Sequence, residues 1–175
     1  MPNRLHKVLD GVADRDRAFY EALRGEDDLG MVVRAHIHIE HELREFIRAA
    51  APAPDQFKPS DLDFGGTVRL ALILGLDAEF KTPLLHLGSL RNKFAHRLDM
   101  RISEEEAKNF WEALGPAAKR AAVGSFESLK VENPDYRMSS LQDFVARDRL
   151  MICVISLRGG ILLEQVRALG KLKEL

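Results

Sequence analysis

Apolar residues recur every three or four positions over most of the chain, which is the spacing of one face of an α-helix. The clearest stripe runs from Leu29 to Ala50, over about six helical turns. Its apolar members are Leu29, Val32, Val33, Ile39, Leu43, Phe46, Ile47 and Ala50. No stretch shows a convincing alternation of the kind that predicts a strand. The pattern therefore predicts an all-α fold, a single-domain bundle of about six to seven helices over residues 1–175.

Helices of the same pattern are predicted on both sides of Leu29 to Ala50. Residues 1–25 carry one or two short helices, with an apolar face formed by Leu5, Val8, Leu9, Val12, Phe19 and Leu23. The core segment, residues 27–115, continues after Ala50 with a loop as far as Gly65-Gly66. A short helix over 67–76, ended by Gly75, and a longer helix over 77–95 follow. The inward positions of the longer helix are Phe80, Leu84, Leu87, Leu90 and Phe94.

The C-terminal half begins with a capping box, in which Ser103 and Glu106 start a helix that ends before Gly115-Pro116. Residues 117–130 are predicted to add only a turn or two, and a loop surrounds Pro134. Ser139 or Ser140 then caps a long final helix, about 139–170. This helix is apolar nearly all round, so we expect it to be deeply packed or shared with a second subunit. Two adjacent glycines at 159–160 predict a close helix–helix approach.

Composition and charge narrow the function classes. The 26 Lys and Arg residues balance 27 Asp and Glu residues, and a net charge of −1 gives no global attraction to nucleic acid. The one cysteine, Cys153, lies in an apolar run and excludes an intrachain disulfide, so we expect a buried thiol and a cytoplasmic location. The first residues lack the apolar segment of a secretory signal. No apolar run approaches the ~20 residues of a membrane span, so no membrane association is predicted.

Two polar residues interrupt the apolar stripe of the 29–50 helix. His36 and Glu40 lie one turn apart on its buried face, where they need hydrogen-bonding partners or form part of a site. The histidine-rich run around them suggests a metal, but only these two side chains converge, and a metal site needs three or four ligands. The sequence starting at His41 also has glutamate where the zinc motif HExxH needs its second histidine. We therefore predict no metal and no cofactor, and expect His38 and His41 to face solvent.

The densest polar chemistry lies in Arg91-Asn-Lys-Phe-Ala-His96, at the end of the 77–95 helix. Arg91 and His96 are about 140° apart on an ideal helix, so they face one cleft only if the helix ends or kinks near Ala95. An arginine fork beside an imidazole suits phosphate chemistry. The alternative is a structural corner, in which Arg91 pairs with an acid such as Glu40 and His96 bonds a last-turn carbonyl. We expect the structural corner first and a catalytic pair second.

This hexapeptide resembles the R-x4-H signature of HEPN domains, which are small and often dimeric helical bundles. Some members of that class are metal-independent ribonucleases, and others are binding modules without activity. The resemblance implies His96 as general base on a ribose 2′-hydroxyl, Arg91 as the phosphate-binding group and Asn92 as the residue that orients one of them. Two copies in a dimer would line one cleft. The balanced charge argues against this reading, because RNA binding needs a positive surface.

A longer resemblance is to the mannitol operon repressor family. It covers residues 27–115, including Phe64-Gly-Gly-Thr-Val-Arg-Leu-Ala-Leu-Ile-Leu-Gly-Leu76 and the helix from Leu84 to His96, and extends more weakly over 147–171. That family is all-helical, lacks a recognisable DNA-binding motif, and controls the expression of sugar-uptake genes. The resemblance implies a cytoplasmic, homodimeric regulatory module that binds a protein partner, or less readily DNA. The alternative is an endoribonuclease that uses Arg91, Asn92 and His96, with His36 and Glu40 as supporting residues.

Overall fold

The computed structural model describes residues 17–58, 62–97, 100–132 and 140–172. Its α-helices are α2 (Asp28–Ala50), α3 (Phe64–Ile73), α4 (Lys81–Ala95), α5 (Glu104–Ala113), α6 (Pro116–Glu132) and α7 (Ala146–Leu172). Residues 17–24 are also helical. Three 3-10 turns are η1 (Pro54–Gln56), η3 (Ala78–Phe80) and η4 (Leu141–Asp143). The described residues contain no strand, so the predicted all-α fold is confirmed.

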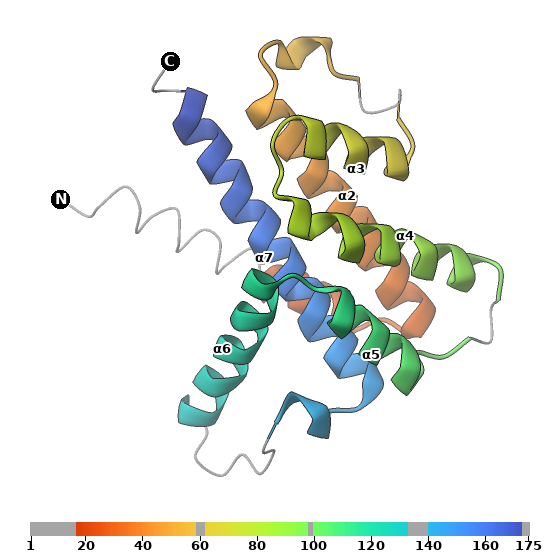
Figure 1. Cartoon of the computed structure of the whole chain (residues 1–175). Coiled ribbons are helices and arrows are strands. Elements are labelled where there is room, and N and C mark those ends of the chain that lie inside the picture. Colours follow the sequence, from red (N-terminus) through yellow and green to blue (C-terminus); the bar gives the residue numbers. More distant parts are fainter. Residues whose placement is uncertain (1–16, 59–61, 98–99, 133–139, 173–175) are drawn as a thin grey trace.

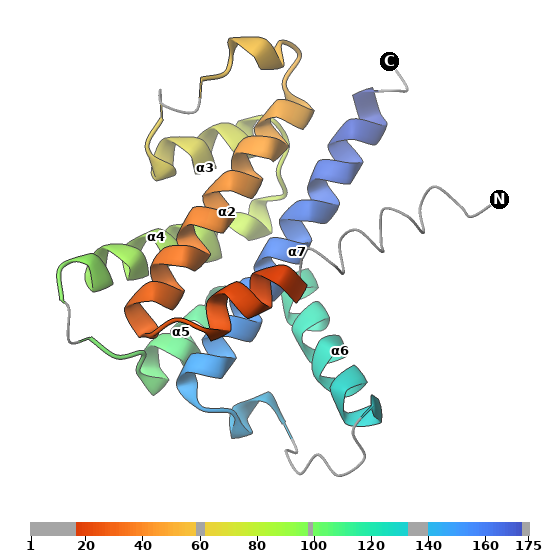
Figure 2. The ribbon, with the colours of Figure 1, turned by 180° about the vertical axis from the view of Figure 1, so that it is seen from behind.

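Helix α7 is the central element of the bundle (Figure 1). It packs against α2, α5 and α6, whereas α3 and α4 pack against each other and against α2. The opposite view shows residues 17–24 lying across α2 and α7 (Figure 2). One cluster of buried apolar side chains takes members from each of these helices. Most apolar side chains of α7 are therefore buried within one chain, whereas Leu163 and Leu169 are 45% and 50% exposed.

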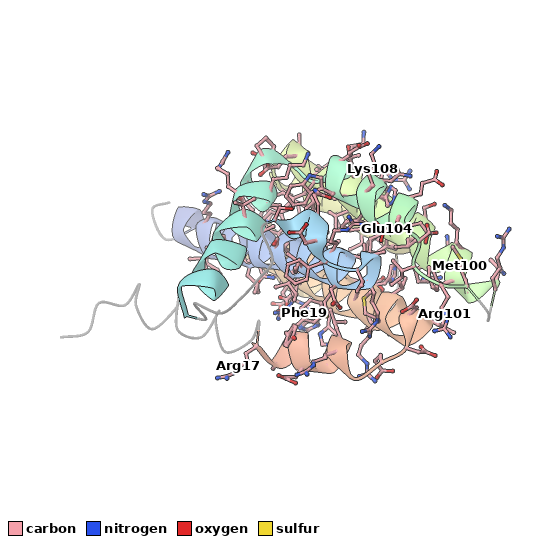
Figure 3. The ribbon with its side chains drawn as sticks, turned by 90° about the horizontal axis from the view of Figure 1, so that it is seen from below. Arg17, Phe19, Met100, Arg101, Glu104 and Lys108 are labelled. Atoms are coloured by element: carbon pink, nitrogen blue, oxygen red, sulfur yellow. The ribbon has the colours of Figure 1, made fainter. Side chains whose placement is uncertain are left out.

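The first described helix confirms two predicted inward positions. Phe19 and Leu23 are fully buried, and the other predicted apolar positions, Leu5 to Val12, lie outside the described residues. Figure 3 shows the side chain of Phe19 directed into the bundle and that of Arg17 directed away from it. The ring centroids of Phe19 and His38 are 4.9 Å apart. His38 is therefore half-buried rather than solvent-facing as predicted, whereas His41 is exposed as predicted.

Helix α2 begins one residue before the predicted stripe. The side chain of its N-cap residue, Asp27, accepts a hydrogen bond of 2.7 Å from the N–H of Gly30. The apolar stripe lies on the buried side, but the buried face is wider than the stripe. It includes Met31, Val32, Ala35, His36, Ile39, Glu42, Leu43, Phe46, Ile47 and Ala49. The burial of Glu42 was not expected, because a lone carboxylate is costly to remove from water.

The boundaries of α3 and α4 differ from the prediction. Helix α3 starts at Phe64, before the predicted start, because the Asp63 carboxylate caps it through the N–H of Gly66 at 2.7 Å. Gly65 and Gly66 therefore form its first turn rather than a loop. Gly75 ends the helix as predicted, with a φ of 101° that only glycine adopts without strain. Helix α4 is preceded by the separate turn η3. All five inward positions predicted for residues 77–95 are buried.

In the C-terminal half, one predicted helix start is confirmed, one predicted helix length is wrong and one predicted start is wrong. Both hydrogen bonds of the Ser103–Glu106 capping box are present at the start of α5. Helix α6 is 17 residues long, not a turn or two. Helix α7 starts at Ala146, because the hydroxyl of Ser140 instead accepts the N–H of Gln142 in η4. Ser139 and the predicted loop around Pro134 lie outside the described residues.

Two predictions about the interior of α7 are confirmed. A Cβ added at Gly160 would lie 2.8 Å from the ring of Phe80, so this glycine permits a close approach, as predicted, but to the 3-10 turn η3 at the start of α4. Cys153 is a free thiol that is 2% exposed, and burial raises its pKa to about 12. Such a thiol is a core residue rather than a nucleophile. Within the described ranges, no helix is both long enough and apolar enough to cross a bilayer.

Candidate functional site

An open hollow of about 900 Å³ lies where the start of α3, the second half of α4 and the first turn of α5 meet. It brings together most of the residues that the sequence singled out. His36 reaches it from α2, Arg91 and Asn92 from α4, and His96 from the end of α4. The segment after α4 contributes Met100, which Figure 3 shows near the edge of the molecule beside Arg101. Glu40 does not line the hollow.

Arg91 and His96 line the same hollow, and α4 ends between them. The last residue of the helix is Ala95, and His96 is its C-cap, with a φ of −100° and a ψ of −2°. Arg91 is half-buried and His96 is exposed. The pair thus has the common exposure to one ligand that a site requires.

The structural corner predicted for this region is seen only in part. His96 is the C-cap of α4, and its backbone N–H donates to the carbonyl of Phe94 in the last turn, as predicted. The predicted pairing of Arg91 with Glu40 is not present. Nη1 of Arg91 donates to Oδ1 of Asn92 at 2.9 Å, and Glu40 instead accepts from Nη2 of Arg44 at 2.8 Å. No described residue accepts a hydrogen bond from the imidazole of His96. Glu40 does not pair with Arg91 because it lies one helical turn before Arg44 and pairs with that residue within α2. Arg91 and His96 are therefore available to a ligand.

His36 is the most unusual polar group of the hollow. Its side chain is 3% exposed, and its ring centroid lies 4.2 Å from that of Phe64. Its Nδ1 is 4.0 Å from Oε2 of Glu40, and its Nε2 has no hydrogen-bond partner. Burial, and then the nearby guanidinium of Arg91, lower its pKa to about 4. His36 is therefore a neutral imidazole at neutral pH, with one nitrogen unused.

The hollow is locally basic, although the chain as a whole is not. Arg91, Lys93 and Arg97 line it together with two acids, Asp63 and Glu106. Both acids are committed to helix starts: Asp63 caps α3, and Glu106 accepts the N–H of Ser103 at 3.1 Å. No described acid forms an ion pair with the three cations. The lining therefore carries three cations against two acids, a small local excess of positive charge. Lys93 and Arg97 were missed because only the fold turns them toward Arg91.

A second polar cluster, between α2 and α7, was not predicted. Nη2 of Arg158 donates to Oε1 of Glu42 at 2.6 Å, and Nε2 of Gln165 donates to Oε2 at 3.0 Å. The guanidinium carbon of Arg158 lies 4.9 Å from the ring centroid of Phe19. The side chains of Arg158 and Glu42 are only 5% and 6% exposed. This buried network joins two helices and offers no open face to a ligand, so we assign it to structure.

Metal chemistry finds no support in the part of the chain that is described. There, no three histidine, cysteine, aspartate or glutamate side chains converge as a metal ion requires. His36 and Glu40 are neighbours on α2, but they lack a third ligand.

Comparisons with protein families, with curated proteins and with solved structures gave no match. The two resemblances seen in the sequence therefore remain the basis of proposals, and the geometry of the hollow decides how each is tested.

Proposed function

We propose that this chain is a regulatory binding module, similar in role to the mannitol operon repressor family, and that the hollow around Arg91 is its recognition surface. One observation carries the proposal. Three cationic side chains, Arg91, Lys93 and Arg97, line one open hollow without a described acid paired to them. Cations that the fold leaves unpaired in a concave surface are complementary to an anionic partner.

A protein partner is favoured over DNA. The net charge of −1 supplies no wide positive field of the kind that draws a protein to a duplex. The basic surface is instead confined to one hollow, which suits a short acidic segment of another protein. In this proposal the chain acts in the control of gene expression through that partner.

Site-specific photo-crosslinking tests this proposal. A photoreactive amino acid at Asn92, which is exposed in the hollow, is expected to capture a partner in cells. The same amino acid at Arg69, which is exposed on α3 outside the hollow, is the matched control. The captured protein should be lost when Arg97 is changed to Glu, and transcripts that respond to deletion of the chain should respond equally to Arg97→Glu. Capture that is equal at both positions would contradict the proposal.

The second candidate is a metal-independent endoribonuclease, and it is favoured by the shared exposure of Arg91 and His96. His96 would take the proton of a ribose 2′-hydroxyl, and Arg91 would hold the scissile phosphate. The hydrogen bond from Arg91 to Asn92 supports a more specific role for Asn92, which would fix the orientation of the guanidinium. His36 and Glu40 would support the site from α2.

RNA cleavage in EDTA tests the second candidate. The wild-type chain should cleave single-stranded RNA, and His96→Ala should lower the rate by about 10²-fold or more, because a positioned general base contributes on that scale. His41→Ala is the matched control, since His41 is exposed on α2 outside the hollow. Absence of cleavage by the wild type across pH and RNA sequence would remove the enzyme reading and leave the binding module standing.

The proposal includes a cytoplasmic homodimer, as the resemblance to both families implies. Sedimentation velocity at micromolar concentration would measure the mass directly. A monomer under these conditions would contradict the dimer without affecting the binding role of the hollow, because Arg91 and His96 line it within one chain.

A further inference from the structure

The hollow differs from a simple basic patch because Nε2 of His36 has no hydrogen-bond partner. His36 belongs to the lining, yet its Nε2 is buried and has no partner. An unsatisfied polar atom in a native interior is costly, and one that lies beside a cavity gains a partner when a ligand brings one. A basic surface made of lysines and arginines alone would contain no buried nitrogen without a hydrogen-bond partner.

The direction of the missing hydrogen bond follows from Glu40. The carboxylate of Glu40 lies 4.0 Å from Nδ1 of His36, so it favours the proton of the neutral imidazole on that nitrogen. Nε2 is then an acceptor, and the group that it lacks is a donor. A ligand hydroxyl or N–H would supply that donor, whereas a carboxylate or phosphate oxygen would not.

The cations determine the other end of the ligand. A single carboxylate is satisfied by one arginine, but a phosphate monoester carries close to two negative charges at neutral pH. Arg91, Lys93 and Arg97 supply three cations against the two acids of the lining, whose carboxylates are held by backbone N–H groups at helix starts. A volume of about 900 Å³ also accommodates a small organic molecule beyond the phosphate.

Phe64 lines the hollow beside His36. Its ring packs against the ring of His36, and a Cβ at Gly88 would lie 3.0 Å from its Cδ1, so the ring sits directly on the backbone of α4. Because Nε2 is buried, a ligand that bonds it must displace a neighbouring side chain, and Phe64, the half-buried first residue of α3, is the ring in contact with His36.

We infer that the hollow is the binding site of a small phosphate monoester, whose phosphate lies on Arg91, Lys93 and Arg97 and whose hydroxyl or N–H group donates to Nε2 of His36. The inference rests on the proposed regulatory function for its consequence. A ligand on these cations competes with an acidic partner, so it would act as the effector that releases the partner.

Calorimetric titration of the purified full chain tests the inference. The probes are inorganic phosphate, ribose 5-phosphate, adenosine 5′-monophosphate and ribose. At least one monoester should bind about tenfold more tightly than inorganic phosphate, because it adds the bond to His36. Ribose 5-phosphate offers only hydroxyl donors, so its tighter binding would identify a hydroxyl donor, whereas adenosine 5′-monophosphate offers both ribose hydroxyls and the N–H donors of its base. Ribose should not bind detectably.

Three variants test which residues bind the phosphate of the ligand and which bind its hydroxyl or N–H group. His36→Leu should abolish the advantage of the monoester and leave the affinity for inorganic phosphate unchanged. Arg91→Gln should weaken every phosphate probe, and Arg69→Gln, at an exposed cation outside the hollow, should weaken none. Monoesters that bind no more tightly than inorganic phosphate, or an advantage that survives His36→Leu, would overturn the inference.

A spectroscopic measurement on the wild type covers the case in which His36→Leu does not fold. The ¹⁵N signal of His36 Nε2 should shift when the tighter monoester is added and stay in place with inorganic phosphate. A signal that does not move at saturating monoester would overturn the assigned hydrogen bond. Because the measurement uses no partner, its failure would leave the crosslinking test of the proposed function unaffected.

Discussion

At the scale of single residues, His36 links the stability of the fold to pH. Its pKa is lowered from 6.5 to about 4, chiefly by burial. As pH falls, the unfolded chain takes up this proton first, so the contribution of His36 is fully present above about pH 6.5 and is lost toward pH 4. The loss amounts to about 3 kcal/mol at most, which is large beside the usual stability of a domain.

The corresponding prediction compares the pH dependence of two proteins. Urea unfolding of the wild type should lose more stability between pH 7 and pH 4.5 than unfolding of His36→Leu, which has no proton to bind at this position. The difference between the two slopes isolates His36, although burial also lowers the pKa values of His38 and His86. Equal slopes would show that His36 is solvated in the folded state. His41→Ala, at an exposed position, controls for the loss of a histidine.

The candidate residues were recognisable in the sequence to different degrees. Arg91 and His96 stood out because a short polar run interrupts an apolar helix, and His36 because it occupies an apolar position on a regular stripe. Lys93 and Arg97 did not stand out, since exposed lysines and arginines are ordinary on helices. Only the end of α4 at Ala95, with the packing of α3 beside it, makes them part of one surface.

At the scale of elements, the buried pair Glu42–Arg158 joins α2 to the central helix α7. Glu42→Gln should lower the free energy of unfolding by about 3–5 kcal/mol, because it leaves the guanidinium buried without its counter-charge. The double variant Glu42→Leu, Arg158→Met should be closer to the wild type, since neither charge is then buried. Urea denaturation measures both.

An exposed pair on α2 provides the control for this prediction. Glu45 pairs with Arg48, and both side chains are about 40% exposed. Glu45→Gln should therefore cost less than about 1 kcal/mol, as solvent screens the interaction. If Glu42→Gln cost no more than Glu45→Gln, water would have to reach the Glu42–Arg158 pair in the folded protein.

A second prediction at this scale concerns the close approach of α7 to η3. Gly160→Ala should destabilise the fold by about 1–3 kcal/mol, because its Cβ would lie 2.8 Å from the ring of Phe80. Gly124→Ala, in the interior of α6 with nothing within 4 Å of the added Cβ, should be neutral or stabilising by up to about 1 kcal/mol. Thermal unfolding of the two variants separates contact from helix propensity. A stabilising Gly160→Ala would contradict the close packing.

The sequence predicted the buried faces of helices, which follow from side-chain spacing. It missed a helix start that depends on a capping residue. The apolar positions of α2 and α4 follow the helical period, so the sequence identified their buried faces. The start of α3 was missed because two glycines, Gly65 and Gly66, outweighed the capping signal of Asp63. The Glu42–Arg158 pair was missed for a different reason. Its members lie 116 positions apart, and no local pattern reports such a pairing.

At the scale of the whole molecule, a neutral chain carries a local basic surface. Balanced charge removes long-range attraction to nucleic acid, but the cations of the hollow still contact an anion that enters it. A wide basic surface and a small basic hollow predict different salt dependences of nucleic-acid affinity. A wide positive surface neutralises many phosphates and gives a steep dependence on salt, whereas a hollow with three cations neutralises few.

The salt dependence of RNA binding therefore tests where, if anywhere, single-stranded RNA binds. Filter binding of a short oligonucleotide should give a slope of log K against log salt of about −2, as expected when about three phosphates are neutralised on a single strand. Lys93→Gln should bring the slope closer to zero by about 0.7, the share of one contact. Lys108→Gln, on α5 outside the hollow, should leave the slope unchanged. A slope that is insensitive to Lys93→Gln would place the RNA on another surface and separate nucleic-acid binding from the Arg91–His96 site.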